Sequence, residues 1–478
     1  MSVTLAYDLG GGGLRAALIL AEGETAAAAS RAFAGAPGGE ADPDAWWRAA
    51  ADLADELSAA APDPFATVAA IAVAGFTRTQ VLVDAAGAPV RPAIGFADDR
   101  AAALVPEMLA RTPEDAAERR RLNAYHPAAR LFWLARHEPE ALARAAHVLE
   151  PKDFLNLRLT GRVAGDAISA ARLKAAAEGG AASVLAALGI DAALTPPLLS
   201  PTDVVGPARG GLPGALSRLA GRPVIAMAHD TWAAVLGLGA LRPGAAYVLS
   251  GTTEVFGLIA RETDEAEGLL RVDWGPETIQ IGGPSLAGGD AVRWVSGVIA
   301  EGGAAVRAGA GDLLFLPYLR GERTPWWDAS LRGAFLGLSA EHGPEDLLRA
   351  ALEGIALLNR VVLDRAEAAA GLAAEEIRFG GGGARNAAWA QIKANACRRP
   401  VVATAAAETG LLGCAVAARA ALGDFPSLAA AQASMARVAR RFEPEPEAAL
   451  RFDRLLPLFL RAHEALAPIS AALARGGS

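Results

Sequence analysis

The feature that most constrains the fold is a strand–glycine turn–strand pattern that occurs twice, about 240 residues apart. Near the N-terminus an apolar run, Val3–Tyr7, leads into Asp8 and four consecutive glycines, and the apolar run Ala16–Leu20 leads away. At Ala245–Ser250 a similar run enters the turn Gly251-Thr252-Thr253, and another apolar strand follows. Two such units predict two related halves with a cleft between them rather than a short-period repeat.

Further apolar runs predict an α/β protein in which strands alternate with helices. The expected strands are 68–74, 80–84, 222–228, 377–379 and 400–404, and the expected helices are 43–60, 231–239, 344–371 and 387–398. Turn residues at Arg242-Pro243-Gly244 mark the expected boundary between the halves. We therefore expect a first domain over residues 1–243 and a second over residues 244–478.

Length and charge exclude several classes of protein. A chain of 478 residues is too long for one hydrophobic core. Its net charge of −8, without a dense Lys/Arg stripe, argues against a nucleic-acid partner. No apolar run reaches the roughly 20 residues of a membrane span, and Asp8 interrupts the first one, so we expect no membrane association, no secretory signal and a cytoplasmic location. Cys397 and Cys414 are expected to be buried thiols rather than a disulfide or a metal pair.

The first glycine turn has the chemistry of a metal–phosphate site. Backbone amides of Gly10, Gly11, Gly12 and Gly13 can approach a phosphate closely. Asp8 would repel a phosphate directly, but it fits if Mg²⁺ lies between the two. A glycine-rich hairpin without any ligand is the alternative. Nearby, Arg15 is either an exposed hairpin charge or a phosphate ligand.

A third glycine turn, Gly380–Gly383, follows the strand at 377–379 and raises the possibility of a dinucleotide-binding fold. That fold needs a third glycine where this chain has Arg385 or Asn386, which weakens the interpretation. Glu408 nevertheless follows at about the distance expected of a ribose-binding acid. The dinucleotide-binding interpretation fits the N-terminal turn less well, because Asp8 would face the pyrophosphate and a strand follows where that fold requires a helix.

Two acidic segments lie where strands end. Asp230 stands between a strand and a helix, so it is either a helix N-cap or a general base at the mouth of the sheet, and spacing alone favours the cap. Asp98-Asp99-Arg100 follows the strand end at Ile94 and is either a solvated turn or a site for sugar hydroxyls.

Taken together, these segments resemble the FGGY carbohydrate kinases, and within them the xylulokinase-like branch. The resemblance extends from Asp8 to about Leu422. It is carried by Asp8-Leu9-Gly10 with Arg15, Ala93–Arg100, Pro127–Leu134, Asp153–Gly161, Asp166 to Ser169, His229-Asp230, Gly251-Thr252-Thr253, Leu316–Pro325, and Gly380–Asn386 with Glu408 to Gly413.

The resemblance implies a two-domain actin-like, ribonuclease-H-like ATPase fold with a deep interdomain cleft, and ATP-dependent phosphorylation of a ketose hydroxyl, with D-xylulose the first expected substrate. It favours Asp230 as the general base, against the N-cap. The other implied roles are Mg²⁺ binding by Asp8, phosphate binding by Gly10, Gly11, Gly12, Gly13, Arg15, Gly251, Thr252 and Thr253, adenosine binding by Gly381, Gly382, Gly383 and Asn386, and sugar binding by Thr77, Arg78, Asp98, Arg100 and His229 together with Asp230.

Two departures from the family pattern keep alternatives open. The family usually has threonine or serine where this chain has Gly11 and Gly12, which predicts weaker ATP binding. Arg78 stands where xylulokinases have a histidine, so another ketose, a polyol or an acidic sugar is an alternative substrate. A non-catalytic actin-like sensor of nucleotide and sugar is the rival class. A homodimer is one assembly compatible with either class.

Overall fold

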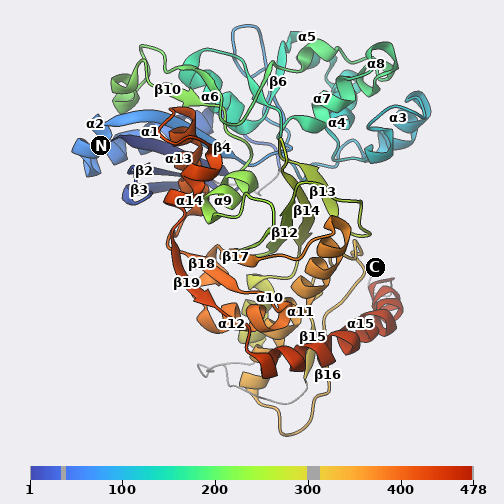
Figure 1. The fold of residues 1–478 in the computed structure, drawn as a ribbon. Helices are drawn as coiled ribbons and strands as arrows, with labels where there is room; N and C mark the ends of the chain where they lie inside the picture. Colours follow the sequence, from blue (N-terminus) through green and yellow to red (C-terminus); the bar gives the residue numbers. More distant parts are fainter. Residues whose placement is uncertain (1, 34–38, 299–312, 476–478) are drawn as a thin grey trace. The chain divides into compact units, whose positions relative to one another are not determined.

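The computed structural model describes residues 2–33, 39–298 and 313–475. Its chain forms two compact units (Figure 1), each with its own sheet and core. The first unit comprises Met1–Gly237 and Gly410–Met435, and the second comprises Leu238–Thr409 and Ala436–Ser478. Within the described ranges, no helix combines the length and the apolar character that crossing a lipid bilayer would need.

A six-stranded sheet forms the centre of the first unit. Its strands lie in the order β3 (Thr25–Ala32), β2 (Gly13–Ile19), β1 (Val3–Gly10), β4 (Val68–Gly75), β10 (Pro223–Ile225) and β9 (Val204–Pro207). The expected hairpin is present, with β1 antiparallel to β2 and β2 antiparallel to β3. Strands β1, β4 and β10 run parallel to one another. Their carboxyl ends therefore meet at one edge, where ligands of α/β sheets usually bind.

The second unit repeats this arrangement in a seven-stranded sheet. The order is β13 (Leu270–Asp273), β14 (Ile279–Ser285), β12 (Glu254–Ala260), β11 (Ala245–Ser250), β17 (Glu376–Gly380), β18 (Val401–Thr404) and β19 (Val438–Phe442). Here too an antiparallel hairpin, β11 with β12, adjoins parallel pairs, β11 with β17 and β17 with β18. The prediction of two related halves is confirmed strand by strand, and β13 is the additional edge strand.

Helices and short strand pairs complete the first unit. The helices are α1 (Pro43–Ala60), α2 (Pro62–Ala66), α3 (Val105–Arg111), α4 (Pro127–His137), α5 (Pro139–Arg144), α6 (Pro151–Thr160), α7 (Ala171–Ala177), α8 (Val184–Ala187), α9 (Asp230–Leu238), α13 (Thr409–Ala421) and α14 (Leu428–Met435), and the short pairs are β5 (Val81–Val83) with β6 (His147–Leu149) and β7 (Gly165–Asp166) with β8 (Leu198–Leu199). Helix α1 has the predicted bounds because Asp42 caps its first turn and Pro43 occupies the first helical position.

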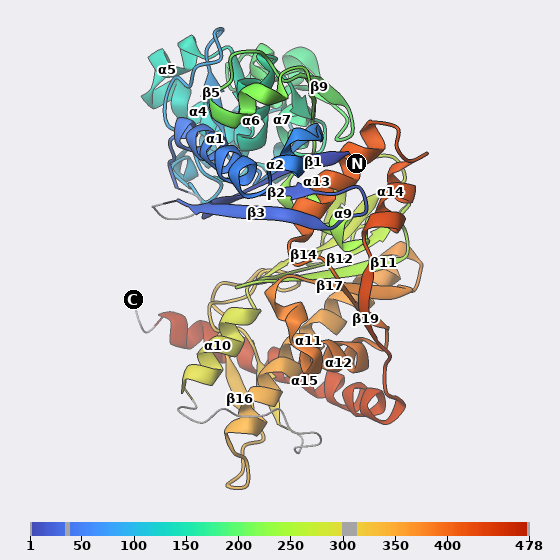
Figure 2. The same ribbon diagram turned by 90° about the vertical axis from the view of Figure 1, so that its left-hand side faces the viewer.

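Within the described residues of the second unit, four α-helices and one short strand pair accompany the sheet. They are α10 (Gly289–Val298), α11 (Pro344–Ala370), α12 (Ala387–Cys397), α15 (Pro446–Arg475) and the pair β15 (Leu314–Leu316) with β16 (Ala334–Leu336). Buried side chains of α11, α12 and α15 form one hydrophobic core with the sheet. Figure 2 shows α11 and α12 side by side below the strands. Helix α11 ends at Gly371, whose φ of 60° is left-handed.

The division between the units differs in one respect from the single boundary expected near residue 243. Residues 410–435, with most of α13 and all of α14, belong to the first unit although they lie between the second unit's strands β18 and β19 in sequence. In Figure 1 these red helices lie beside the blue N-terminal strands. Close backbone packing explains the placement: a Cβ on Gly413 would lie 1.8 Å from the carbonyl oxygen of Ala233 in α9.

Candidate active site

The candidate site of the first unit begins at a row of backbone positions across its three parallel strands. Leu9 at the end of β1 is in register with Gly75 at the end of β4, and Gly75 pairs in turn with His229 beyond β10. Asp8 precedes this row by one residue and Asp230 follows it by one. Three segments far apart in sequence therefore bring two carboxylates to the carboxyl edge of the same sheet.

His229, rather than Asp230, makes the capping hydrogen bond at the start of α9. Nδ1 of His229 accepts a hydrogen bond from the amide of Trp232 at 3.2 Å, which is the bond of an N-cap residue. Burial lowers the pKa of His229, so its neutral ring keeps this acceptor. Oδ1 of Asp230 accepts from the amide of Thr231 at 2.6 Å, and in the described part of the chain its Oδ2 accepts no hydrogen bond. Asp230 has 41% of its side chain exposed, so its second carboxylate oxygen can accept a further hydrogen bond.

A buried lysine holds the strand end that leads to Asp230. Nζ of Lys152 lies 2.5 Å from Oδ1 of Asp153 and 2.8 Å from Oδ2 of Asp166. The same ammonium donates to the carbonyl oxygen of Ala226 at 3.1 Å. Removing Lys152 would leave both carboxylates buried without their counter-ion, and it would remove one of the two side-chain donors to Ala226, four residues before Asp230.

Glu150 adds a third carboxyl group to this cluster. Desolvation, and next the negative charge of Asp153, raises the pKa of Glu150 to about 8. The amide of Thr79, in the loop after β4, donates to its Oε2 at 3.4 Å. At neutral pH the folded protein therefore holds Glu150 largely protonated, whereas the unfolded chain ionises it.

This difference predicts how stability depends on pH. Between about pH 4.5 and pH 8 the folded state binds one proton more than the unfolded state, so the free energy of unfolding falls as pH rises. One group contributes at most about 1.4 kcal/mol per pH unit, and partial exposure of Glu150 makes the expected slope smaller. Glu150→Gln should gain stability over wild type as pH rises from 6 to 8. Urea unfolding at several pH values measures this, and parallel curves for the two proteins would refute it.

Asp8 lies in a partly exposed position beside its cross-strand neighbour Arg15. Oδ2 of Asp8 is 3.8 Å from Nη1 of Arg15, whose side chain is 56% exposed, against 15% for the carboxylate. Gly410, at the start of α13, makes room for Asp8 because a Cβ at that position would lie 2.8 Å from Oδ2. The orientation of the Asp8 carboxylate thus depends on a glycine four hundred residues away in sequence.

We expect Gly410→Ala to fold but to turn the Asp8 side chain, because the contact is with the tip of a flexible side chain. If Asp8 holds the metal, activity should fall about tenfold or more, and the Mg²⁺ concentration for half-maximal rate should rise. Titrating Mg²⁺ at saturating ATP measures both. Unchanged Mg²⁺ dependence would show that the position of Asp8 is irrelevant to metal use.

Arg78 lies in the loop after β4 with a left-handed backbone, φ 63°, and its side chain is exposed. The buried guanidinium of Arg130 in α4 fixes this loop by donating to the carbonyl oxygens of Arg78 at 2.6 Å and of Phe96 at 3.0 Å. Its Nε also donates to the carbonyl oxygen of Asp98 at 3.4 Å, so Arg130 joins two predicted sugar-binding segments, 77–78 and 98–100. Thr77 stands beside Arg78 with a buried hydroxyl that has no hydrogen-bond partner within the described ranges.

Asp98 and Arg100 bind each other. The guanidinium of Arg100 donates to Oδ1 and Oδ2 of Asp98 at 2.8 Å and 2.7 Å, and it also donates to Glu40 at 2.7 Å. Desolvation raises the pKa of Asp98, but the hydrogen bonds and charge of Arg100 outweigh it and keep the pKa below its ordinary value. Arg100 also lies over the ring of Trp133, 4.8 Å from its centroid. A sugar at this place would meet a preformed ion pair rather than two independent side chains.

In the second unit, two glycine loops leave neighbouring parallel strands. Gly251, Thr252 and Thr253, all exposed, follow β11, and Gly381, Gly382 and Gly383 follow β17. The loops touch, since a Cβ on Gly381 would lie 2.4 Å from the carbonyl oxygen of Ser250 and one on Gly383 would lie 2.6 Å from its hydroxyl. Asn386 caps α12 by accepting from the amide of Trp389, so its carbonyl oxygen is already engaged.

The sequence did not reveal which charged side chains are buried near the candidate site of the first unit. Arg130 lies in the matched segment Pro127–Leu134, whereas Glu150 and Lys152 lie just outside the matched segments. Nothing in a single sequence distinguishes a buried lysine or arginine from an exposed one. Cys397 and Cys414 are buried and free, as predicted. Among the described residues no three His, Cys, Asp or Glu side chains gather into a metal-binding group.

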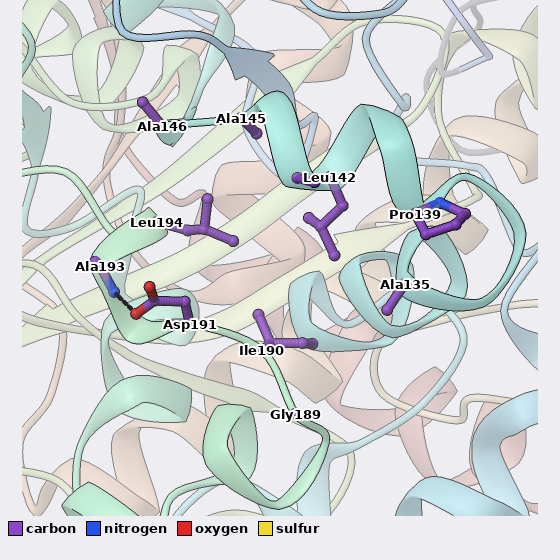
Figure 3. A pocket seen from close by; sticks show the side chains of 11 residues that line it. Ala135, Pro139, Leu142, Ala145, Ala146, Gly189, Ile190, Asp191, Ala193 and Leu194 are labelled. Carbon is purple, nitrogen blue, oxygen red and sulfur yellow. Dashed lines mark hydrogen bonds between the residues drawn. The ribbon is translucent and has the colours of Figure 1, made fainter.

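A cavity of about 480 Å³ in the first unit lies between α4, α5 and the segment 189–194. Figure 3 shows its mainly apolar lining, with Ile190, Leu142 and Leu194 pointing inward. Its charged lining residue, Asp191, accepts a hydrogen bond from the amide of Ala193. None of the predicted site residues lines this cavity.

Comparison with known proteins identifies the family over most of the chain. Residues 3–237 match the N-terminal domain of the FGGY family of carbohydrate kinases, and residues 246–422 match its C-terminal domain. The chain is 30% identical over 416 residues to the xylulose kinase of Escherichia coli (strain K12), covering 82% of this chain and 84% of that protein.

Solved structures agree on the fold. The crystal structure of xylulose kinase from Rhodospirillum rubrum superposes with a TM-score of 0.84 at 27% identity, covering 98% of this chain and 99% of the other. Gluconate kinase from Lactobacillus acidophilus superposes with a TM-score of 0.85 at 22% identity, covering 98% of both chains, which bears on the fold alone.

The predicted two-domain, actin-like ATPase fold is confirmed, and the dinucleotide-binding alternative is excluded. The chain is a sugar phosphotransferase with ATP as phosphate donor, so the interpretation as a non-catalytic sensor is set aside. It belongs to the FGGY family of carbohydrate kinases.

Proposed function

We propose that the protein transfers the γ-phosphate of ATP to a hydroxyl of D-xylulose, with Asp230 as general base. The observation that carries the proposal is the half-exposed Asp230 carboxylate, whose neighbour His229 takes over helix capping and leaves one oxygen available. Relatives named xylulose kinase cover most of the chain and support the choice of sugar.

In this proposal Oδ2 of Asp230 accepts the proton of the attacking sugar hydroxyl. The oxygen of that hydroxyl forms a bond to the γ-phosphorus at the same time. The bond between that phosphorus and the β,γ-bridging oxygen breaks, and ADP leaves with the electron pair. Phosphoryl transfer asks mainly for positioning and charge neutralisation, so the protein has little covalent work to do. Lys152, through Ala226, would keep the segment that carries Asp230 in place.

We assign phosphate binding to the backbone amides of the loops Gly10–Gly13 and Gly251–Thr253. Asp8 suits Mg²⁺, because it is a partly exposed oxygen ligand and Gly410 leaves space beside it. A single protein carboxylate is typical for Mg²⁺, which keeps water and phosphate oxygens as its other ligands. When bound, Mg²⁺ would neutralise charge on the phosphates, and Asp8 would be its protein ligand.

Gly12 offers a direct test of the first phosphate loop. A Cβ on Gly12 would meet nothing within 4 Å, whereas a Cβ on Gly13 would lie 2.7 Å from the carbonyl oxygen of Arg31. Gly12→Ser should therefore fit and supply the hydroxyl that related kinases have. Hydrogen bonds to charged groups contribute about 1.5–3 kcal/mol, so we expect the KM for ATP to fall about tenfold. An unchanged KM for ATP, with Gly12→Ala as control, would place the phosphates elsewhere.

Arg78 supports a second candidate substrate class. Its exposed guanidinium stands on a backbone anchored by Arg130, where it could pair with a carboxylate. An aldonic acid is therefore the alternative to D-xylulose, followed by another ketose or a polyol.

A coupled ADP-release assay with Mg²⁺-ATP distinguishes these substrates across ketopentoses, ketohexoses, pentitols and aldonic acids. We expect the highest kcat/KM with D-xylulose. The control is Arg209→Gln, which removes another exposed arginine of the first unit that is not a predicted site residue. A preference for an aldonic acid that is lost in Arg78→Gln, but not in this control, would favour the alternative. If no sugar of the panel supports ADP release, both D-xylulose and the alternative substrates would be contradicted.

A further inference from the structure

The second unit contains a buried ionic cluster that the proposed chemistry does not use. Lys393 in α12 and Glu254 at the start of β12 are both 0% exposed, and Asn359 in α11 is 2% exposed. Nζ of Lys393 lies 3.0 Å from each carboxylate oxygen of Glu254 and also donates to Oδ1 of Asn359. Nδ2 of Asn359 donates to Oε2 of Glu254 at 3.0 Å, which closes the triangle.

Stability alone is a poor explanation for such a cluster. Desolvating two charges opposes their attraction, and a buried ion pair is often no better for stability than apolar residues of similar volume. Buried ionic groups can instead specify one arrangement of the segments that they join. The segments that Lys393 joins therefore indicate which arrangement the cluster specifies.

One of these segments is the second phosphate loop. Glu254 directly follows Gly251-Thr252-Thr253, so the ion pair fixes the end of that loop. The loop's carbonyl oxygens are held from the other side, since the amides of Gly289 and Asp290 in α10 donate to Gly251 and Thr252 at 3.0 Å and 2.9 Å.

The other segment is the adenosine loop, Gly381–Gly383. The Lys393 ammonium lies 4.6 Å from the ring centroid of Trp389 and 5.3 Å from that of Phe379. Both rings flank the loop: Phe379 lies in β17 just before it, and a Cβ on Gly383 would lie 2.9 Å from the Trp389 ring. Cations over aromatic faces are attracted most strongly where water is excluded, as it is here.

We propose that Lys393 is a positioning residue that couples the second phosphate loop to the adenosine loop, so that a nucleotide ordering one loop also orders the other. The proposal rests on the assignment of these two loops to ATP. The ligand class that it concerns is the adenine nucleotide, and sugar binding in the first unit should be independent of it.

The test replaces the ion pair without leaving a buried charge, by combining Lys393→Met with Glu254→Gln. The two side-chain amides at positions 254 and 359 can then pair with each other, and methionine fills much of the lysine volume. We expect a protein with a melting temperature near that of wild type, but with a Kd for ADP weakened roughly tenfold because the loops are no longer preorganised. The KM for the sugar should not change.

The matched control is Lys174→Met with Glu178→Gln, which removes an exposed ion pair of the first unit. Wild-type binding of ADP is measured first: no binding at all would contradict the assignment of the loops to ATP, not the coupling. If wild type binds ADP and the folded double variant binds it within twofold of wild type, the coupling is refuted.

If the double variant does not fold, amide hydrogen exchange of the wild-type protein tests the coupling of the two loops. Adenosine lacks phosphates and can contact the adenosine loop alone. With coupling, adenosine should slow amide hydrogen exchange at residues 251–254 as well as at residues 381–386. Protection confined to residues 381–386 would overturn the proposal.

Discussion

Asp230→Asn is expected to lower kcat by about 10²–10⁴-fold while leaving the KM values for ATP and sugar within a few-fold of wild type. The substitution keeps the size of the side chain and the acceptor for the Thr231 amide, which is 2.6 Å from Oδ1. It removes the carboxylate that would take the substrate proton. Steady-state kinetics at saturating ATP and sugar give both constants.

Asp191→Asn is the matched control, because Asp191 also accepts amide hydrogen bonds at the start of a helical turn of the first unit. That variant should keep wild-type kinetics. An Asp230→Asn protein with wild-type kcat would remove Asp230 as the base. A large rise in the KM for the sugar with unchanged kcat would instead make Asp230 a binding residue.

Gly413→Ala is expected to have the largest effect on stability. Its Cβ would lie 1.8 Å from the carbonyl oxygen of Ala233, so α13 and α9 would have to move apart. Overpacking of this kind costs about 3 kcal/mol, and here the obstacle is rigid backbone. Activity should fall too, because α9 begins at Asp230. Urea unfolding and kcat measured on the same preparation test both effects.

Gly297→Ala is the control for the helix glycine itself. Gly297 lies in α10, is exposed, and a Cβ there would meet nothing within 4 Å. Alanine should stabilise this helix by about 0.5–1 kcal/mol. If Gly413→Ala behaved like Gly297→Ala, α13 would not pack on α9 as described.

Local sequence patterns predicted the central strands of both sheets and the helices α1, α9, α11 and α12, because hydrophobic periodicity and turn residues act over a few residues. The bounds of α1 and β11 agree with prediction. The doubled glycine-turn hairpin correctly predicted two related halves, although not the order of the strands in their sheets. Packing between segments far apart in sequence is not a local property. For this reason the placement of residues 410–435 in the first unit was not predicted.

Some residues of the candidate site were predicted from the sequence and others were not. Asp8, Asp230 and the glycine loops could be found because they follow apolar strands, where chemistry concentrates in α/β proteins. The capping role of His229 could not be found, because it depends on a side-chain torsion. Lys152 and Lys393 were missed for a related reason: burial of a charge depends on partners that the sequence places far away, such as Asp166 and Glu254.

The most direct test of the central claim is phosphorus NMR of Mg²⁺-ATP with D-xylulose, comparing wild type with Asp230→Asn. Sampled early in the reaction, wild type should form one sugar phosphate monoester and an equal amount of ADP, while the variant should form at most about one-hundredth as much of either. Equal formation of the ester by both proteins would contradict the proposed role of Asp230. Conversion of ATP by wild type to ADP and free phosphate, with the sugar unchanged, would contradict phosphorylation of D-xylulose.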